Sequence, residues 1–395
     1  MKKRKIAIFT GNRAEYGLQY PIIKAIVAHP GLDYYLLVSG AHLDEKFGYT
    51  KKEIEKDGFQ VYKEVKAEVK ADDLFSTTQA VGHIILNLSK ELNSLKPDFL
   101  VVYADRFEGL AAVIAGNQMG IPVAHIEGGD VTSGGALDDY VRHAMSKLAH
   151  LHFTTNQEAA DRIAKLGEER WRIFNTGFPV IDLIKAGKYT SLDEIKERFH
   201  IDPAKPIVLF TQHSITTELD KIEEQIRPSL EALISCAEEG IQVIITYPNN
   251  DAGGRRIIDE LKKLEERKIP NLFFYDHLGR SVYHGFLNIC GKAGTGVCVG
   301  NSSSGIKETP AFGSPFVNIG TRQEGRLRST NVIDASYDKD EILKAIKKSL
   351  FDESFREECK NCLNPYGEGG SGEKIAKVLA DIELNRDLLQ KKITY

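Results

Sequence analysis

Short apolar runs alternate along the chain with longer segments in which apolar residues recur at helical spacing. In the first half the apolar runs are 5–10 (KIAIFT), 32–40, 98–104 (DFLVVYA), 121–126 (IPVAHI), 151–155 and 172–177. The segments with helical spacing between them are 18–29, 77–95, 108–120 and 138–150. Near-continuous apolar strands that alternate with amphipathic helices predict a parallel sheet covered by helices on both faces.

The same pattern starts again in the second half. Further strands are predicted at 207–212, 241–248, 271–276, 296–301 and 314–320. Helices are predicted between them at 218–239, 254–267, 281–288, 304–312 and 339–351, and a last one at 371–391. We therefore expect an α/β protein with two domains, 1–190 and 191–370, followed by a C-terminal helical segment, 371–395. A cleft between two such domains is a natural place for a ligand.

Length and charge narrow the class of protein. The 395 residues are too many for one ordinary core, which agrees with two domains. The net charge of −4 gives no reason to expect nucleic acid or an anionic membrane as a partner. No apolar run approaches the roughly 20 residues that cross a bilayer, and the N-terminus lacks the apolar core of a signal peptide. We expect a cytoplasmic protein, without a disulfide framework, because its five cysteines are scattered.

A candidate phosphate-binding turn follows the first predicted strand. In parallel α/β sheets, ligands bind beyond the carboxyl ends of the strands. There, Gly11 would let a ligand approach the backbone, and Arg13 offers a planar fork to phosphate oxygens. The alternative is a plain turn with a solvated arginine.

Three carboxylates follow neighbouring strands of the first domain: Asp105, Glu127 and Asp138. Like charges brought close together raise the pKa of at least one of them, which suits general acid–base work near neutral pH. Asp105 can also be read as a helix cap, with Glu108 at capping-box spacing. Metal binding by the same acids is the competing hypothesis, but no tight set of His and Asp ligands accompanies them.

The second domain carries a matching set of polar residues at its predicted strand ends. His213 follows the first strand, and Ser302 and Ser303 lie in GNSSSG, where hydroxyls and helix N–H groups would suit a diphosphate. Glu308 could accept hydrogen bonds from sugar hydroxyls, and Arg322 follows the next strand. A structural histidine, a helix cap and a solvated arginine are the alternatives. Together the residues favour an enzyme that acts on a nucleotide sugar. A nucleotide-sugar-binding sensor would not need the three acids.

The motifs GNRAEYG, ADRFEG, AHIEGGDVTSGGALDDYVRHAMSKLAH, YPNNDAGG, GNSSSG and GTRQEGR, in this order, resemble the UDP-N-acetylglucosamine 2-epimerase family across nearly the whole chain. RAEYG, DDYVRHAMSKLAH and NNDAGG are more similar to its hydrolysing branch. The resemblance implies the GT-B fold: two Rossmann-like domains face a cleft, and a C-terminal helix crosses back to the first domain. We expect the protein to need neither a cofactor nor a metal, and to form a homodimer or homotetramer.

The resemblance further implies a reaction. A base removes the proton at sugar C2 while UDP leaves from C1, which gives a 2-acetamidoglycal. Water then adds in the hydrolysing branch and releases N-acetylmannosamine and UDP, for sialic-acid-type sugar synthesis. By the same resemblance, the catalytic residues are Asp105, Glu127, Asp138 and His213. The substrate-binding residues are Arg13, Ser302 and Ser303 at the diphosphate, Glu308 at the ribose, and Arg322.

Two departures from the family pattern leave alternatives open. The segment QHSITTE lacks the proline that many relatives have after the histidine, and LNICGKAGTGVCVGNSSSG carries extra glycines. The alternatives are a UDP-2,4-diacetamido-trideoxyglucose 2-epimerase, on the route to legionaminic acid, and a non-hydrolysing 2-epimerase.

Overall fold

The computed structural model describes residues 3–45, 49–68, 74–131, 136–202, 204–215, 217–248 and 253–395, without the side chains of 74 and 136–138. The chain divides into two compact units. Unit 1 comprises Leu137–Asp182 and Gly369–Tyr395 together with the N-terminal part up to Val131. Unit 2 is built mainly from Leu183–Glu368. The sequence placed these two boundaries at residues 190 and 370.

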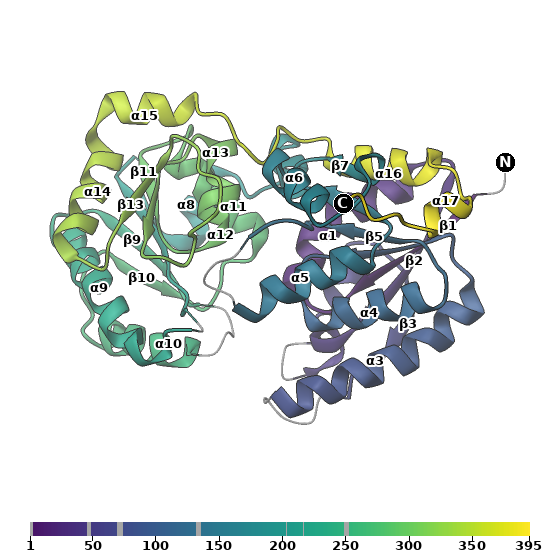
Figure 1. Ribbon diagram of the computed structural model, residues 1–395. Helices are drawn as coiled ribbons and strands as arrows, with labels where there is room; N and C mark the ends of the chain where they lie inside the picture. Colours follow the sequence, from purple (N-terminus) through teal and green to yellow (C-terminus); the bar gives the residue numbers. More distant parts are fainter. Residues whose placement is uncertain are drawn as a thin grey trace. The chain divides into compact units, whose positions relative to one another are not determined.

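Unit 1 is built around a parallel sheet (Figure 1). In the described part of the chain it has seven strands in the order β3-β2-β1-β4-β5-β6-β7. The strands are β1 (Arg4–Thr10), β2 (Leu32–Ser39), β3 (Val61–Val65), β4 (Phe99–Tyr103), β5 (Val123–Ile126), β6 (Leu151–Thr154) and β7 (Ile173–Asn175). The direction in which strands are added reverses between β1 and β4, and such a switch point is where doubly wound sheets bind ligands.

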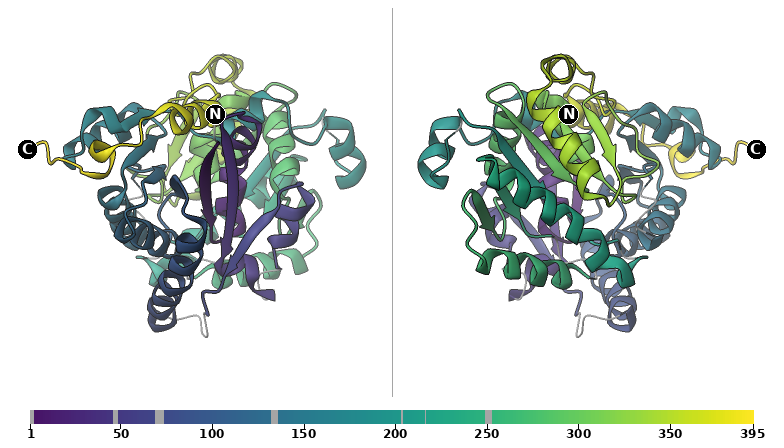
Figure 2. Two further views of the ribbon diagram at one scale, coloured as in Figure 1. Left: turned by 90° about the vertical axis from the view of Figure 1, so that its right-hand side faces the viewer. Right: turned by 90° about the vertical axis from the view of Figure 1, so that its left-hand side faces the viewer.

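Helices cover both faces of this sheet (Figures 1 and 2). The helices of unit 1 are α1 (Arg13–Ala28), α2 (Lys51–Lys56), α3 (Leu74–Leu95), α4 (Phe107–Gln118), α5 (Ala136–Leu148), α6 (Gln157–Lys165), α16 (Ser371–Asp381) and α17 (Arg386–Leu389), and α7 (Val180–Lys185) begins in unit 1 and ends in unit 2. Ile6 and Ile8 of β1 pack with α1, α16 and α17, whereas Ala7 and Phe9 pack with α3, α4 and α5. Burial on both faces is why the central strands of the sheet are largely apolar.

The C-terminal segment belongs to unit 1. Helix α16 packs on α1, with Ile375 and Leu379 in the same apolar cluster as Ile22 and Ile26. A Cβ atom at Gly372 would lie 2.6 Å from the carbonyl oxygen of Pro21, so the glycine permits this close approach. The C-terminal helix therefore returns to the first domain, as expected.

Unit 2 repeats the architecture. In the described residues its parallel sheet has six strands in the order β10-β9-β8-β11-β12-β13, with the switch point between β8 and β11. The strands are β8 (Ile207–Thr211), β9 (Gln242–Thr246), β10 (Leu272–Tyr275), β11 (Gly296–Gly300), β12 (Phe316–Ile319) and β13 (Val332–Ala335). The helices are α8 (Leu192–Phe199), α9 (Ile222–Glu238), α10 (Gly254–Glu266), α11 (Arg280–Cys290), α12 (Ser303–Lys307), α13 (Thr309–Phe312), α14 (Lys339–Phe351) and α15 (Glu353–Lys360).

Some elements differ from the sequence prediction. Strands β3 and β13 were not predicted, and both are edge strands whose polar residues break the apolar run. The helix predicted over 304–312 is two short helices that meet at Glu308. The helix predicted over 371–391 is also interrupted, between α16 and α17.

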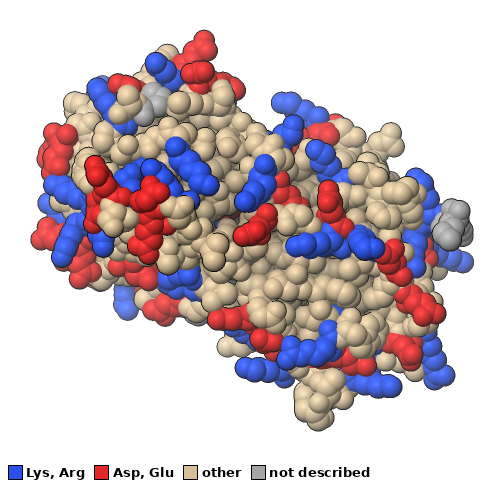
Figure 3. Space-filling view, turned by 90° about the horizontal axis from the view of Figure 1, so that it is seen from above, with Lys and Arg blue, Asp and Glu red and all other residues tan. Residues whose placement is uncertain are grey.

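The surface is mixed in charge. On the face shown in Figure 3, acidic and basic side chains are interspersed rather than gathered by sign, in keeping with the small net charge. Among the described residues, no helix is both long and apolar enough to cross a membrane.

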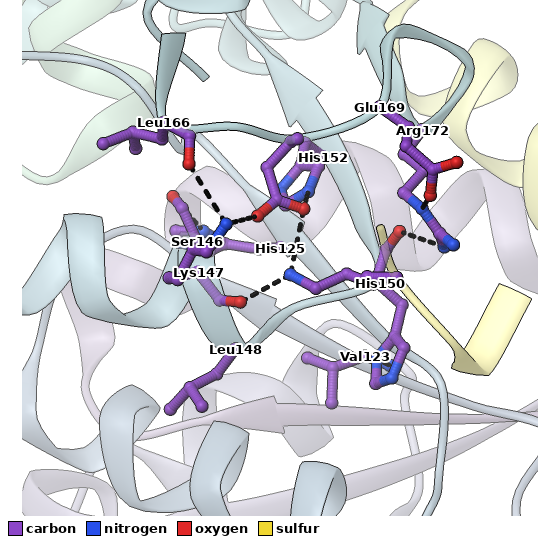
Figure 4. A network of polar contacts seen from close by, with 12 residues as sticks. Val123, His125, Ser146, Lys147, Leu148, His150, His152, Leu166, Glu169 and Arg172 are labelled. Carbon is purple, nitrogen blue, oxygen red and sulfur yellow. Dashed lines mark hydrogen bonds and ion pairs between the residues drawn. The ribbon is translucent and has the colours of Figure 1, made fainter. Parts of the chain in front are cut away.

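A network of polar contacts around a buried carboxylate lies beside strand β6 of unit 1 (Figure 4). Glu168 accepts hydrogen bonds from Lys147 Nζ at 2.9 Å, Lys391 Nζ at 2.9 Å and His152 Nε2 at 3.2 Å. Burial alone would raise the pKa of Glu168, but these three donors outweigh it and lower the pKa to about 2. The network thus joins the last turn of α5, strand β6 and the C-terminal tail.

The tail is held by a second buried group. The side chain of Arg172 is inaccessible to solvent and donates to the backbone carbonyls of Asp387 and Leu388, the latter at 2.7 Å, and to Glu169 at 2.8 Å. A buried guanidinium is costly unless its donors are satisfied. The tail carbonyls therefore complete the core of unit 1.

Acidification below pH 6.5 is expected to destabilise the protein. Burial lowers the pKa of His42, His125 and His150 from 6.5 to about 4 in the folded state, so below pH 6.5 the unfolded chain binds protons that the folded chain does not. Glu15 opposes this, because burial raises its folded pKa from 4.5 to about 8. Three histidines outweigh one glutamate, so the unfolding free energy should fall by on the order of 1–3 kcal/mol per pH unit between pH 6.5 and 4.5. Urea titrations at several pH values measure the unfolding free energy. A value that stays constant or increases as the pH falls from 6.5 to 4.5 would contradict the prediction.

Candidate active site

The first cluster of candidate residues lies at the switch point of unit 1. Arg13 is the first residue of α1, directly after β1, and its Nε lies 3.1 Å from Glu53 Oε2. Both side chains are more than two-fifths exposed, so this ion pair is weak and Arg13 remains accessible to a ligand. The helix is capped by Asn12, whose side chain accepts a hydrogen bond from the backbone N–H of Glu15 at 3.0 Å.

The carboxyl groups of Glu15 and Glu108 lie beside Gly11 and are buried, which the sequence did not reveal. Glu15 accepts hydrogen bonds from Gly11 N at 3.0 Å and from Gln19 Nε2 at 2.9 Å. A Cβ atom at Gly11 would lie 2.9 Å from the Cβ atom of Glu108, so a side chain there would displace α4. Glu15 follows Arg13 in the first turn of a helix, where an acid normally reads as an exposed charge.

Asp105 follows β4, on the other side of the switch point, and is bound by Arg142 of α5. Arg142 Nη1 also donates to Asp139 Oδ1 at 3.2 Å. The reading of Asp105 as a helix cap is wrong, because α4 starts at Phe107 with Arg106 at its N-cap position. Asp105 is instead a partly exposed carboxylate held by an almost completely buried arginine.

Glu127 follows β5, the strand beside β4, and is buried. Its backbone has a φ angle of 65°, and Ala104 at the end of β4 has a φ of 54°. Side chains other than glycine seldom adopt this left-handed conformation, and such strain gathers at functional sites. The two turns are linked, since Ala104 N donates to the carbonyl oxygen of Ile126 at 2.9 Å.

Buried polar groups hold these turns. His125 Nε2 donates to the carbonyl oxygen of Ala104 at 2.7 Å, and its Nδ1 lies 3.0 Å from Ser146 Oγ on α5. Since a carbonyl can only accept and burial lowers the pKa of His125 to about 4, the ring is neutral and Nδ1 accepts from the serine. Tyr103, fully buried beside them, has its pKa raised by burial and by the charge of Glu127.

The other acids of this loop have different environments. Asp130 is buried and accepts from Thr155 Oγ1 at 2.7 Å and Asn156 Nδ2 at 3.3 Å, so it braces the start of α6. Asp138 lies in the first turn of α5, and its side chain is outside the part that the structure describes. Asp105 and Glu127 follow the paired strands β4 and β5, and the convergence of the three acidic side chains stays a prediction.

In unit 2, one asparagine joins three strand ends. Asn301 follows β11; its Oδ1 accepts from His213 N at 2.7 Å, and its Nδ2 donates to the carbonyl oxygen of His213 at 2.9 Å. The carbonyl oxygen of Asn301 accepts from Arg322 Nη1 at 3.1 Å and from Gln323 Nε2 at 2.8 Å. His213 and Arg322 are thus brought together around Asn301, which the sequence did not single out.

The serine turn and Glu308 lie next to this asparagine in the chain. Ser302 is the N-cap residue of α12 but makes no side-chain cap hydrogen bond; its Oγ lies 2.9 Å from Ser304 Oγ. Ser303 is the first residue of that helix. Glu308 Oε2 accepts from the buried His284 Nε2 at 2.8 Å, and its side chain is 12% exposed. The two serines suit an anion, and the histidine holds the glutamate in place.

Most candidate residues of each unit lie just after the carboxyl ends of its strands, whereas Asp138 lies in α5 and Glu308 lies between α12 and α13. Unit 1 holds Arg13, Asp105, Glu127 and Asp138, and unit 2 holds His213, Ser302, Ser303, Glu308 and Arg322. Within the described ranges, no group of three His, Cys, Asp or Glu side chains has the arrangement of a metal site.

Comparison with known proteins identifies the family of the chain. The sequence profile described as UDP-N-acetylglucosamine 2-epimerase matches residues 24–380. A UDP-N,N'-diacetylbacillosamine 2-epimerase (hydrolyzing) from Legionella pneumophila is 34% identical over 99% of this chain and 100% of its own. A UDP-N-acetylglucosamine 2-epimerase from Neisseria meningitidis is 30% identical over 98% of each chain.

A solved structure shares the fold. The crystal structure of UDP-GlcNAc 2-epimerase from Neisseria meningitidis bound to UDP-GlcNAc superposes with a TM-score of 0.79 at 17% identity, over 95% of this chain and 99% of that one. This likeness confirms the predicted fold class of two Rossmann-like domains of the GT-B type. With the profile match and the full-length relatives, it follows that the chain belongs to the UDP-N-acetylglucosamine 2-epimerase family.

Proposed function

We propose that this protein is a hydrolysing 2-epimerase that converts a UDP-linked 2-acetamido sugar into UDP and the free sugar with inverted configuration at C2. The observation that carries the proposal is the pair of carboxylates at adjacent strand ends, Asp105 and Glu127. Asp105 follows Ala104, whose backbone is left-handed, and the backbone of Glu127 is itself left-handed. A sensor that only binds nucleotide sugars would not need backbone strain beneath two acids.

The reaction has two steps in this proposal. A carboxylate removes the proton at C2, the C1=C2 double bond forms, and the C1–O bond to UDP breaks. Water then adds across the double bond, with its hydroxyl at C1 and a proton delivered to C2 from the opposite face. We assign Asp105, Glu127, Asp138 and His213 to these proton transfers. A C2–H is a weak acid, so the leaving diphosphate must also be stabilised.

The nucleotide would be bound by residues suited to its parts. Arg13, Ser302 and Ser303 are assigned to the diphosphate, since a guanidinium and serine hydroxyls both donate to phosphate oxygens. Glu308, oriented by His284, is assigned to the ribose hydroxyls. Arg322, held beside Asn301, would add positive charge near the phosphates.

The proposal also names the sugar of the substrate. Because the Legionella relative shares 34% identity over its full length and is named for diacetylbacillosamine, we propose UDP-N,N'-diacetylbacillosamine as the substrate. UDP-N-acetylglucosamine, leading to N-acetylmannosamine for sialic-acid-type sugars, is the second candidate because of the Neisseria relative.

Incubation with each UDP-sugar followed by NMR tests both the proposed reaction and the proposed sugar. Free 2-acetamido sugar of manno configuration plus UDP is the expected result, with the diacetamido substrate turned over faster, and turnover should persist in EDTA. A mixture of UDP-sugars epimeric at C2 would show the non-hydrolysing reaction. Binding of UDP without turnover of either sugar would favour the sensor.

A further inference from the structure

Arg142 is an unusual arginine in this protein because its side chain is only 3% exposed. Placing a guanidinium in the interior carries a large desolvation penalty unless carboxylates pair with it. Among the described side chains, those of Asp105 and Asp139 pair with Arg142. Asp139 lies three residues earlier on the same helix, so it could pair with an exposed arginine equally well. The contact that requires the buried position is the one to Asp105, which lies in another element.

Arg142 is also part of a closed circuit of contacts. One turn further along α5, Ser146 binds His125, and His125 donates to the carbonyl oxygen of Ala104, the residue before Asp105. The circuit therefore runs from Asp105 through Arg142, along α5 to Ser146, through His125 and back to the backbone of Asp105. Every side chain in it except that of Asp105 is buried. A closed ring of buried hydrogen bonds leaves little freedom for the guanidinium relative to the carboxylate.

The helix that carries Arg142 is anchored at its other end as well. Lys147 donates to Glu168 at 2.9 Å and to the carbonyl oxygen of Leu166 at 3.1 Å, and Lys391 of the tail donates to the carbonyl oxygen of Lys147 (Figure 4). These contacts oppose rotation or sliding of α5. The position of the guanidinium is thus set by the packed core of unit 1.

Asp105 is partly exposed to solvent while Arg142 contacts one of its carboxylate oxygens. Its side chain is 19% exposed, and Arg142 contacts Oδ2. A guanidinium at hydrogen-bond distance favours the ionised carboxylate over the neutral acid. The partly exposed carboxylate of Asp105 is therefore available to a substrate as an oriented, negatively charged group.

We propose that Arg142 is a positioning residue for the reaction: it keeps Asp105 ionised and fixes its orientation toward the reacting carbon atoms. The proposal rests on the function proposed above and deepens it. Asp105 enters the reaction as a carboxylate, able to accept a proton from the sugar but not to donate one. The proton donor must then be another group of the site.

Chemical rescue tests this role. In Arg142→Ala, kcat should fall about 100-fold while KM changes by less than about threefold, since misplacing a catalytic group by an ångström costs that much. Added guanidinium ion, at millimolar concentrations too low to denature, should restore kcat at least about tenfold by refilling the space beside Asp105. Arg142→Lys keeps the charge but not the planar fork, so its kcat should also fall, by about tenfold.

The matched control is Arg170→Ala. Arg170 pairs with Asp161 at 2.8 Å, but its side chain is 71% exposed and lies outside the site. Its loss should leave kcat unchanged with or without guanidinium. Wild-type turnover, measured first in the same assay, separates the two proposals, because a wild-type protein that converts neither UDP-sugar refutes the proposed function itself.

The remaining outcomes decide the inference. If the wild type turns over and Arg142→Ala is folded by near-ultraviolet circular dichroism, then an unchanged kcat, or a low kcat without response to guanidinium, overturns the positioning role. If Arg142→Ala does not fold, Arg142→Lys decides: a lower kcat at unchanged KM supports the role, and wild-type kinetics overturn it.

Discussion

Glu127→Gln is expected to abolish turnover while UDP still binds. The amide has nearly the shape of the carboxylate, so the left-handed turn and its backbone hydrogen bond to Phe153 should survive. The amide cannot accept a proton, however, and loss of a general acid–base group costs about 10³-fold in kcat. The residues assigned to the diphosphate are elsewhere, so the Kd for UDP should change little. Measurement of kcat from UDP release and of Kd by calorimetry tests both parts.

Glu158→Gln is the matched control for this variant. Glu158 lies exposed in the first turn of α6, and the same substitution there should leave kcat unchanged. Retention of wild-type kcat in Glu127→Gln would refute the catalytic assignment. Loss of UDP binding together with turnover would instead point to a disturbed fold.

Gly300→Ala is expected to have the largest effect on stability of any single-methyl addition at the strand ends. Gly300 ends β11 with a φ angle of 130°, and a Cβ atom there would lie 1.9 Å from the carbonyl oxygen of Thr211 on β8. Both the backbone conformation and the contact with a neighbouring strand forbid a side chain. We expect a loss of about 4 kcal/mol, since backbone strain and overpacking combine. The next residue, Asn301, would be displaced, so UDP binding should weaken as well.

Thermal unfolding of Gly300→Ala and Gly82→Ala side by side measures this effect. Gly82 is exposed within α3, and a Cβ atom there meets nothing within 4 Å. Alanine at this position should stabilise the helix by about 1 kcal/mol. Equal melting temperatures for Gly300→Ala and the wild type would show that the strand end relaxes freely, contrary to the expectation.

The elements that the sequence predicted well are the ones buried on both faces. Every residue of strands β4, β5, β8 and β11 is buried, and an apolar run in the sequence indicates this burial. Edge strands lack this apolar run. In β3 (VYKEV), for example, the lysine and the glutamate are exposed to solvent. Placing the candidate residues at strand ends followed from the same pattern, because every parallel strand presents its carboxyl end on the same edge.

The groups that hold the site could not be predicted in the same way. Asn301 binds His213 across 88 residues of chain, and Arg142 binds Asp105 across 37. Nothing local distinguishes this asparagine from a turn residue or this arginine from a surface charge. Glu15 illustrates the same limit, since its pKa near 8 arises from burial that only the packed α1 and α4 create.

The buried Arg172 has a consequence for how the chain is made. Its carbonyl partner at Leu388 lies 216 residues further along the sequence, beyond the whole of unit 2. During synthesis on the ribosome, the strands of unit 1 emerge first, yet this guanidinium stays without its final partners until Asp387 and Leu388 are translated. A nascent unit 1 must therefore persist incomplete while unit 2 is built, with the face of α1 that α16 later covers still open to chaperones. A stop codon that removes only the residues after Leu384 would keep α16 on α1 but leave Arg172 permanently without its partners at Asp387 and Leu388.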